Sequence, residues 1–90
     1  MYRLDYTERA RNNIVQLKKN EPAAYQKLVT LLEELAEHPR TGTGKPKQLS
    51  GNMAGEWSRR ISRTHRLRYL IDDDIVTVTV IQAYGHYDDK

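Results

Sequence analysis

Hydrophobic and polar residues follow two different periods along this chain, and the change of period separates helical from extended segments. A period of two over residues 2–6 predicts a short first strand. Helical spacing then predicts one helix from a Thr7 N-cap to about Asn20 and a second from Pro22 to just before Pro39. The apolar faces of these two helices are predicted to consist of Ala10, Ile14, Leu17 with neighbouring Val15, and Tyr25, Leu28, Leu32, Leu35.

A period of two returns in the second half of the chain. Residues 57–61 and 65–71 alternate, residues 72–74 predict a turn, and residues 75–84 predict the longest strand. A helix hairpin of this kind buries its apolar stripe against one face of a sheet. The predicted fold class is therefore α+β, with the order β-α-α-β-β-β and an antiparallel sheet, in a single domain over residues 1–90.

Composition narrows the class further. The chain has 90 residues, 38% of them hydrophobic, and no cysteine, which excludes disulfides, thiolate metal sites and a cysteine nucleophile. Its apolar runs are too short to span a membrane, and we expect a cytoplasmic protein. The three histidines lack close metal-ligand spacing, so neither a metal nor another cofactor is expected.

Basic residues are concentrated in one part of the chain. The net charge is +3, but Thr41–Ile71 contains seven basic residues and one acidic residue, which gives +6 there and −3 elsewhere. The period of two places Arg60, Arg66 and Arg68 on the sheet face away from the helices. Such a face suits the phosphates of a polyanion, and a merely solvated arginine-rich surface fits the charge equally well.

Further candidates for chemistry lie at the start of this basic segment and beyond its end. Lys45 and Lys47 lie in the loop with which it begins, and His86 and Tyr87 follow the last predicted strand. RNA cleavage without a metal needs a base, a cation that stabilises the phosphorane and an acid, and histidine suits the acid near neutral pH. The glycine-rich loop 42–46 lacks the P-loop pattern, which excludes a nucleotide-binding loop of that type.

Several segments together resemble a known family. Gly42–Pro46, Leu49, Gly55–Ile61, His65–Leu67 and His86–Tyr87 resemble the Txe/YoeB toxins of the RelE/ParE toxin–antitoxin superfamily, with the core G-x-W-S-R-R-I…H-R-L. The likeness covers nearly the whole chain. It implies a RelE-like fold and a ribosome-dependent mRNA endonuclease, which blocks translation by metal-independent attack of a 2′-hydroxyl. It also implies a YefM/Axe-like antitoxin, the ribosomal A site with its mRNA and a homodimer as partners, and no membrane.

The resemblance also assigns the site. Its matching positions make Arg60 and Arg66 the binders of the phosphate and the transition state, and His86 the general acid. The expected catalytic residues are His86, Arg66, Lys47 and Tyr87, and the expected RNA-binding residues are Arg60, Lys45, Arg59 and Arg68.

One position departs from the family pattern. The general-base glutamate that normally follows the Lys-Pro dipeptide is replaced by Lys47. Lys47 acting as base or electrostatic stabiliser, Glu56 supplying a carboxylate, and a slow enzyme all remain open. Two other functions also remain open, namely a ParE-like toxin directed at gyrase and a non-catalytic basic module that binds RNA or a partner.

Overall fold

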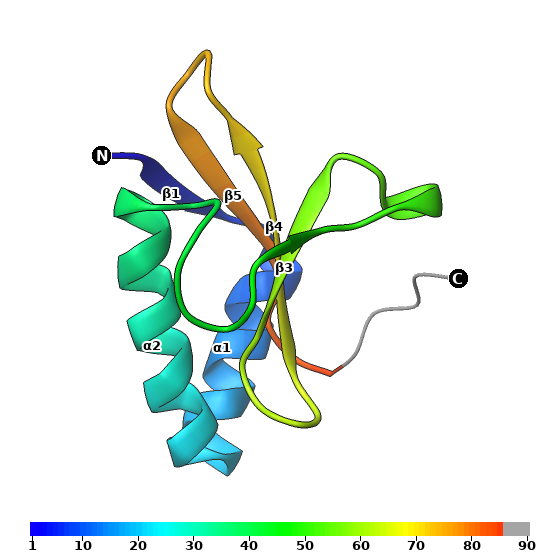
Figure 1. Ribbon diagram of the computed structural model, residues 1–90. Coiled ribbons are helices and arrows are strands. Elements are labelled where there is room, and N and C mark those ends of the chain that lie inside the picture. Colours follow the sequence, from blue (N-terminus) through cyan, green and yellow to red (C-terminus); the bar gives the residue numbers. More distant parts are fainter. Residues whose placement is uncertain (86–90) are drawn as a thin grey trace.

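Two helices cover one face of a five-stranded sheet in the computed structural model, which describes residues 1–85 (Figure 1). The elements are β1 (Arg3–Tyr6), α1 (Glu8–Asn20), α2 (Pro22–Glu37), β2 (Lys47–Gln48), the 3-10 turn η1 (Gly51–Met53), β3 (Glu56–Arg60), β4 (Arg66–Asp72) and β5 (Thr77–Gln82). The predicted order is confirmed, with the two-residue strand β2 in addition. Within the described residues, neither helix has both the length and the apolar composition to cross a membrane.

The predicted helix ends are confirmed by their hydrogen bonds. The Thr7 hydroxyl oxygen accepts from the Ala10 N–H at 3.0 Å, and Pro22 occupies the first turn of α2. The His38 N–H donates to the Glu34 carbonyl at 2.6 Å and ends α2. Buried helix residues that face the sheet are Ala10, Leu17, Ala24, Leu28, Leu31 and Leu35. Val15 is the exception among the predicted apolar residues, because 65% of its surface is exposed.

The sheet is mixed, which corrects the predicted antiparallel arrangement. The strand order is β1-β5-β4-β3-β2, and β1 pairs in parallel with β5 while the other neighbours pair antiparallel. Alternation predicts the two faces of a strand but contains no information on the direction of its neighbour. The helix hairpin returns the chain so that β5 runs alongside β1 in the same direction (Figure 1).

The turn between β4 and β5 is longer than predicted. It extends over residues 73–76, so β5 begins at Thr77 and β4 is the longest strand. An Asp72 carboxylate oxygen accepts from the Asp74 N–H at 3.0 Å, and Val76 adopts a φ of 49°. The β-branched residues Ile75 and Val76 favour a strand by propensity, but this Asx-type turn places them at an exposed tip instead.

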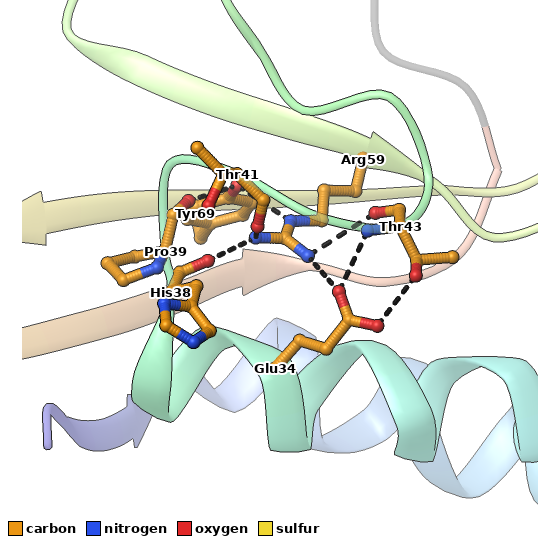
Figure 2. A network of polar contacts seen from close by, with 7 residues as sticks. All are labelled: Glu34, His38, Pro39, Thr41, Thr43, Arg59 and Tyr69. Carbon is orange, nitrogen blue, oxygen red and sulfur yellow. Dashed lines mark hydrogen bonds and ion pairs between the residues drawn. The ribbon is translucent and has the colours of Figure 1, made fainter.

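A buried guanidinium joins the sheet to the helices. Arg59 points from β3 toward α2, and its side chain is fully buried (Figure 2). Each of its five N–H groups has an acceptor. These acceptors are the Tyr69 hydroxyl at 3.1 Å, Glu34 Oε1 at 2.9 Å, and the carbonyls of Thr43 at 3.3 Å, His38 at 2.6 Å and Thr41 at 2.7 Å.

The acceptors of Arg59 are themselves held in place. The Glu34 carboxylate accepts from the Thr43 hydroxyl at 2.6 Å and from the Thr43 N–H at 2.8 Å. These two bonds, together with Arg59, hold the pKa of Glu34 below its ordinary value of 4.5. Burial raises the pKa of Tyr69, whose neutral hydroxyl donates to the Pro39 carbonyl at 2.8 Å. The network therefore fastens the loop after α2 to α2, β3 and β4.

Two glycines let this loop approach the network closely. Gly42 has a φ of +122°, and a Cβ there would collide with the Glu34 carboxylate. Gly44 has a φ of +84°, and a Cβ there would lie 2.9 Å from the Arg60 carbonyl oxygen. Both positions require glycine for backbone conformation as well as for space.

Replacing Arg59 with methionine tests how much the network stabilises the fold. R59M removes the ion pair with Glu34 and the donor to the carbonyls of His38, Thr41 and Thr43, so we expect the free energy of unfolding to fall by about 3–5 kcal/mol. R3M is the matched control, because the Arg3–Asp5 ion pair is exposed and screened by solvent, so its loss should leave the free energy of unfolding almost unchanged. Urea unfolding measures both, and equal losses would contradict the role of Arg59.

The lowered pKa of Glu34 predicts an acid-dependent stability. A carboxyl whose folded pKa lies below its unfolded value stabilises the fold above the unfolded pKa and loses that effect as the pH falls through the folded pKa. The urea midpoint of the wild type should therefore exceed that of E34Q most near pH 7, and the difference should narrow below about pH 4.5. A difference that stays constant down to pH 3 would show that Glu34 does not act through its charge.

Candidate functional site

A pocket opens on the sheet face opposite the helices. Its volume is about 150 Å³, and its lining residues come from the loop after α2 and from β2, β3 and β4. These residues are Gly44, Lys45, Lys47, Ser58, Arg60 and Arg66. Four of the six are cationic and none is acidic, so the pocket is suited to a phosphate or another anion.

Strand register brings the cations of the pocket together. Lys47 lies opposite Ser58 across β2 and β3, and Arg60 lies directly opposite Arg66 across β3 and β4. Two like charges facing each other across an antiparallel pair destabilise the sheet. An anion bound between Arg60 and Arg66 would remove that repulsion. Among the pocket residues, this pair is therefore the strongest indication of an anion-binding site.

The two arginines differ in how firmly they are held. Arg66 Nη1 donates to the carbonyl of Ser62 at 2.6 Å and to that of His65 at 3.1 Å, which orients its guanidinium. Among residues 1–85, the charged end of Arg60 has neither a hydrogen bond nor an ion pair, and the same is true of Lys45 and Lys47. These three charges are therefore available to a ligand.

The position of Lys45 depends on the Arg59 network. Lys45 has a φ of 53°, a conformation that costs a non-glycine residue about 1 kcal/mol or more. The loop is held there because the Arg60 N–H donates to the Gly44 carbonyl at 2.7 Å and Arg59 binds the Thr41 and Thr43 carbonyls. Backbone strain of this kind is typical of ligand sites.

The structure separates two arginines from the expected RNA-binding set. Arg59 lies in the interior with all five N–H groups used, so its predicted contact with RNA is wrong on geometric grounds. Arg68 forms an ion pair with Glu56 at 2.9 Å and does not line the pocket. Arg60, Arg66, Lys45 and Lys47 do meet in one pocket, whereas Arg68, which the alternation groups with the other two arginines, lies outside its lining.

Glu56 is placed away from the pocket as well. Its carboxylate is only 21% exposed, pairs with Arg68 and is absent from the pocket lining. Of the two residues left open as the base, Lys47 is the one inside the pocket.

His86 and Tyr87 lie outside the described residues, so their assigned roles stay predictions. The residue before them is placed, however. The Gly85 carbonyl accepts from the Arg66 backbone N–H at 2.9 Å, so the chain reaches the edge of the pocket at Gly85.

Sequence reasoning missed the partners that hold this region. Glu34 fixes Arg59, and Glu21 contacts His65 with an Oε2–Nε2 distance of 2.6 Å. His65 itself is buried directly before β4. No signal in the sequence pairs Arg59 with Glu34 or His65 with Glu21, because the partners lie 25 and 44 positions apart.

Within residues 1–85, no cluster of three His, Asp or Glu side chains is placed to hold a metal ion.

Comparisons with known proteins agree with this fold and identify its family. Residues 6–87 match the family described as YoeB-like toxin of bacterial type II toxin-antitoxin system. A Toxin YoeB of Streptomyces coelicolor is 34% identical over 85 residues, covering 94% of this chain and 99% of the relative. The chain therefore belongs to the YoeB-like toxin family.

Two solved structures are similar over almost their whole length. The YoeB/ParE toxin from Agrobacterium tumefaciens has a TM-score of 0.88 and 32% identity, and the alignment covers 94% of this chain and 99% of that one. The toxin chain matched in a YoeB-YefM complex from Staphylococcus aureus has a TM-score of 0.81 and 27% identity, with 97% and 99% covered.

Phosphate binding tests the Arg60–Arg66 pair. At constant ionic strength, inorganic phosphate should raise the Tm of the wild type, because it neutralises the facing guanidiniums. R60Q should raise the Tm without phosphate, since one like charge is gone, and should reduce the further rise with phosphate. R9Q removes the same charge from exposed Arg9 on α1 and should leave both values as in the wild type. An undiminished phosphate response in R60Q would contradict the assignment.

Proposed function

We propose that this YoeB-family toxin is a ribosome-dependent mRNA endonuclease that cleaves RNA through attack of a 2′-hydroxyl without a metal ion. The observation that supports it most is the pocket in which Arg60 and Arg66 face each other, with Lys45 and Lys47 beside them and no acidic residue in the lining. Such a pocket can hold the scissile phosphate and stabilise the negative charge that grows on it during attack.

The proposed roles follow the order of the reaction. Lys47 stands next to the 2′-hydroxyl and takes its proton or stabilises the alkoxide, in the place of the family's glutamate. Arg66, held by its backbone acceptors, and Arg60, which has a free end among the described residues, stabilise the phosphorane. Lys45 holds the RNA backbone, as a flexible ammonium does for a phosphate.

The leaving 5′-oxygen requires a proton. His86 is the proposed general acid and Tyr87 its neighbour in the site. Support comes from the chain just before them, because Gly85 is hydrogen-bonded to the backbone of Arg66, which itself lines the pocket.

The proposed partners follow from the charge of this face. A YefM-type antitoxin, the kind of partner named in the Staphylococcus aureus complex, would place acidic and apolar groups over the cationic pocket. Binding such a partner would also stabilise a small domain by mass action. The ribosomal A site with its mRNA is the proposed target, and a homodimer of the free chain stays a prediction.

Cleavage on ribosomes tests the function. Programmed ribosomes with an mRNA in the A site should be cut by the wild type, and H86A should cut about 10²–10⁴ times more slowly because the acid is lost. K47A should lose about 10²-fold or more, whereas K19A, which removes an exposed lysine from α1, should cut at the wild-type rate.

The same assay distinguishes the alternative functions. Intact mRNA together with inhibition of gyrase would favour a ParE-like toxin. Intact mRNA with salt-dependent RNA binding would favour a non-catalytic module. Equal cleavage by the wild type and H86A would remove His86 from the mechanism.

A further inference from the structure

The segment that follows β5 is held by side chains of α1, of β5 itself and of the loop before β4. The Ala83 N–H donates to Asn13 Oδ1 at 3.1 Å, and the Tyr84 carbonyl accepts from Gln82 Nε2 at 2.9 Å. The Gly85 N–H donates to His65 Nδ1 at 2.8 Å. Specific hydrogen bonds therefore hold this irregular backbone up to the last described residue.

His65 is the centre of this arrangement. It is 4% exposed, its ring lies 4.3 Å from that of Tyr84 between centroids, and its Nε2 lies 2.6 Å from Glu21 Oε2. Because Nδ1 accepts a hydrogen bond from Gly85, it carries no proton, and the neutral ring must carry its proton on Nε2. The Nε2–H then donates to Glu21, which fixes the tautomer and the orientation of the ring.

Gly85 is held on both sides by consecutive residues. Its N–H binds the His65 ring, and its carbonyl accepts from the backbone N–H of Arg66 at 2.9 Å. Arg66 lines the cationic pocket, whereas His65 does not. A connection therefore runs from Glu21, at the junction of the two helices, through the imidazole to the backbone at the edge of the pocket.

We infer that His65 is a positioning residue for the C-terminal catalytic segment. Its ring, oriented by Glu21, fixes the backbone of Gly85 beside that of Arg66, and Gly85 is the residue that directly precedes the proposed acid His86 in the sequence. The inference rests on the proposed function in so far as His86 is the acid. His65 itself touches neither substrate nor reacting atoms, because it is buried beneath the segment.

Two substitutions of similar size separate this role from general packing. Asparagine has its oxygen on Cγ, where histidine has Nδ1, so H65N keeps an acceptor for the Gly85 N–H and loses the contact with Glu21. Glutamine has its amide one atom farther out, where histidine has Nε2, so H65Q keeps a donor to Glu21 and loses the acceptor for Gly85. Both variants lose the ring contact with Tyr84, so any effect of packing is common to them.

Two measurements are made on each variant. Hydrogen exchange of the Gly85 amide, followed by NMR on the free protein, should be about tenfold or more faster in H65Q than in H65N, which should stay near the wild type. In ribosome-dependent mRNA cleavage, H65Q should lose about 10- to 100-fold in kcat with little change in KM, because a misplaced acid slows the chemical step. H65N should recover most of that loss.

Each outcome has a distinct meaning. Equal losses in the two variants, or a loss in KM alone, would overturn positioning and leave His65 a packing residue. A slower kcat without faster Gly85 exchange would overturn the hydrogen bond as its cause. A wild type that cleaves no mRNA would refute the proposed function and with it the role in cleavage, while the exchange experiment would still decide whether His65 anchors Gly85.

Discussion

A buried guanidinium in need of acceptors organises this protein. Removing a charge from water costs several kcal/mol unless its hydrogen bonds are replaced, so Arg59 is compatible only with a fold that supplies five acceptors. The fold takes one from Glu34 on α2, one from Tyr69 on β4 and three from carbonyls of the loop after α2. The path of that loop is thereby determined, and glycine is required where it passes closest to the network.

The same constraint connects the interior with the site. Adjacent residues of a strand point to opposite faces, so Arg59 enters the core while Arg60 enters the pocket. The buried arginine holds the loop that carries Lys45 and leads into β2 at Lys47, and the exposed one lies opposite Arg66 across β3 and β4. Like charges gathered in this way weaken a small domain, as functional sites often do. The rigid network beneath the pocket is what keeps them together.

The helix ends and the face of the sheet on which the cations lie could be predicted from local patterns, because helix caps, prolines and side-chain alternation depend on residues only a few positions apart in the chain. Thr7, Pro22 and the shared face of Arg60 and Arg66 are examples. Arg59 is two residues from Trp57 and therefore shares its inward face, a consequence of the period of two that the assignment of Arg59 to RNA binding did not use. Its acceptors, the parallel pairing of β1 and the link between His65 and Gly85 depend on residues far apart in the chain, which periodicity does not relate.

The most direct measurement is a structure of the protein bound to a short RNA whose attacking 2′-hydroxyl is replaced by hydrogen. The account predicts a phosphate between the guanidiniums of Arg60 and Arg66, with Lys47 beside the 2′-position and the Arg59 network unchanged. A phosphate bound elsewhere, with Arg60 and Arg66 still facing solvent, would contradict it.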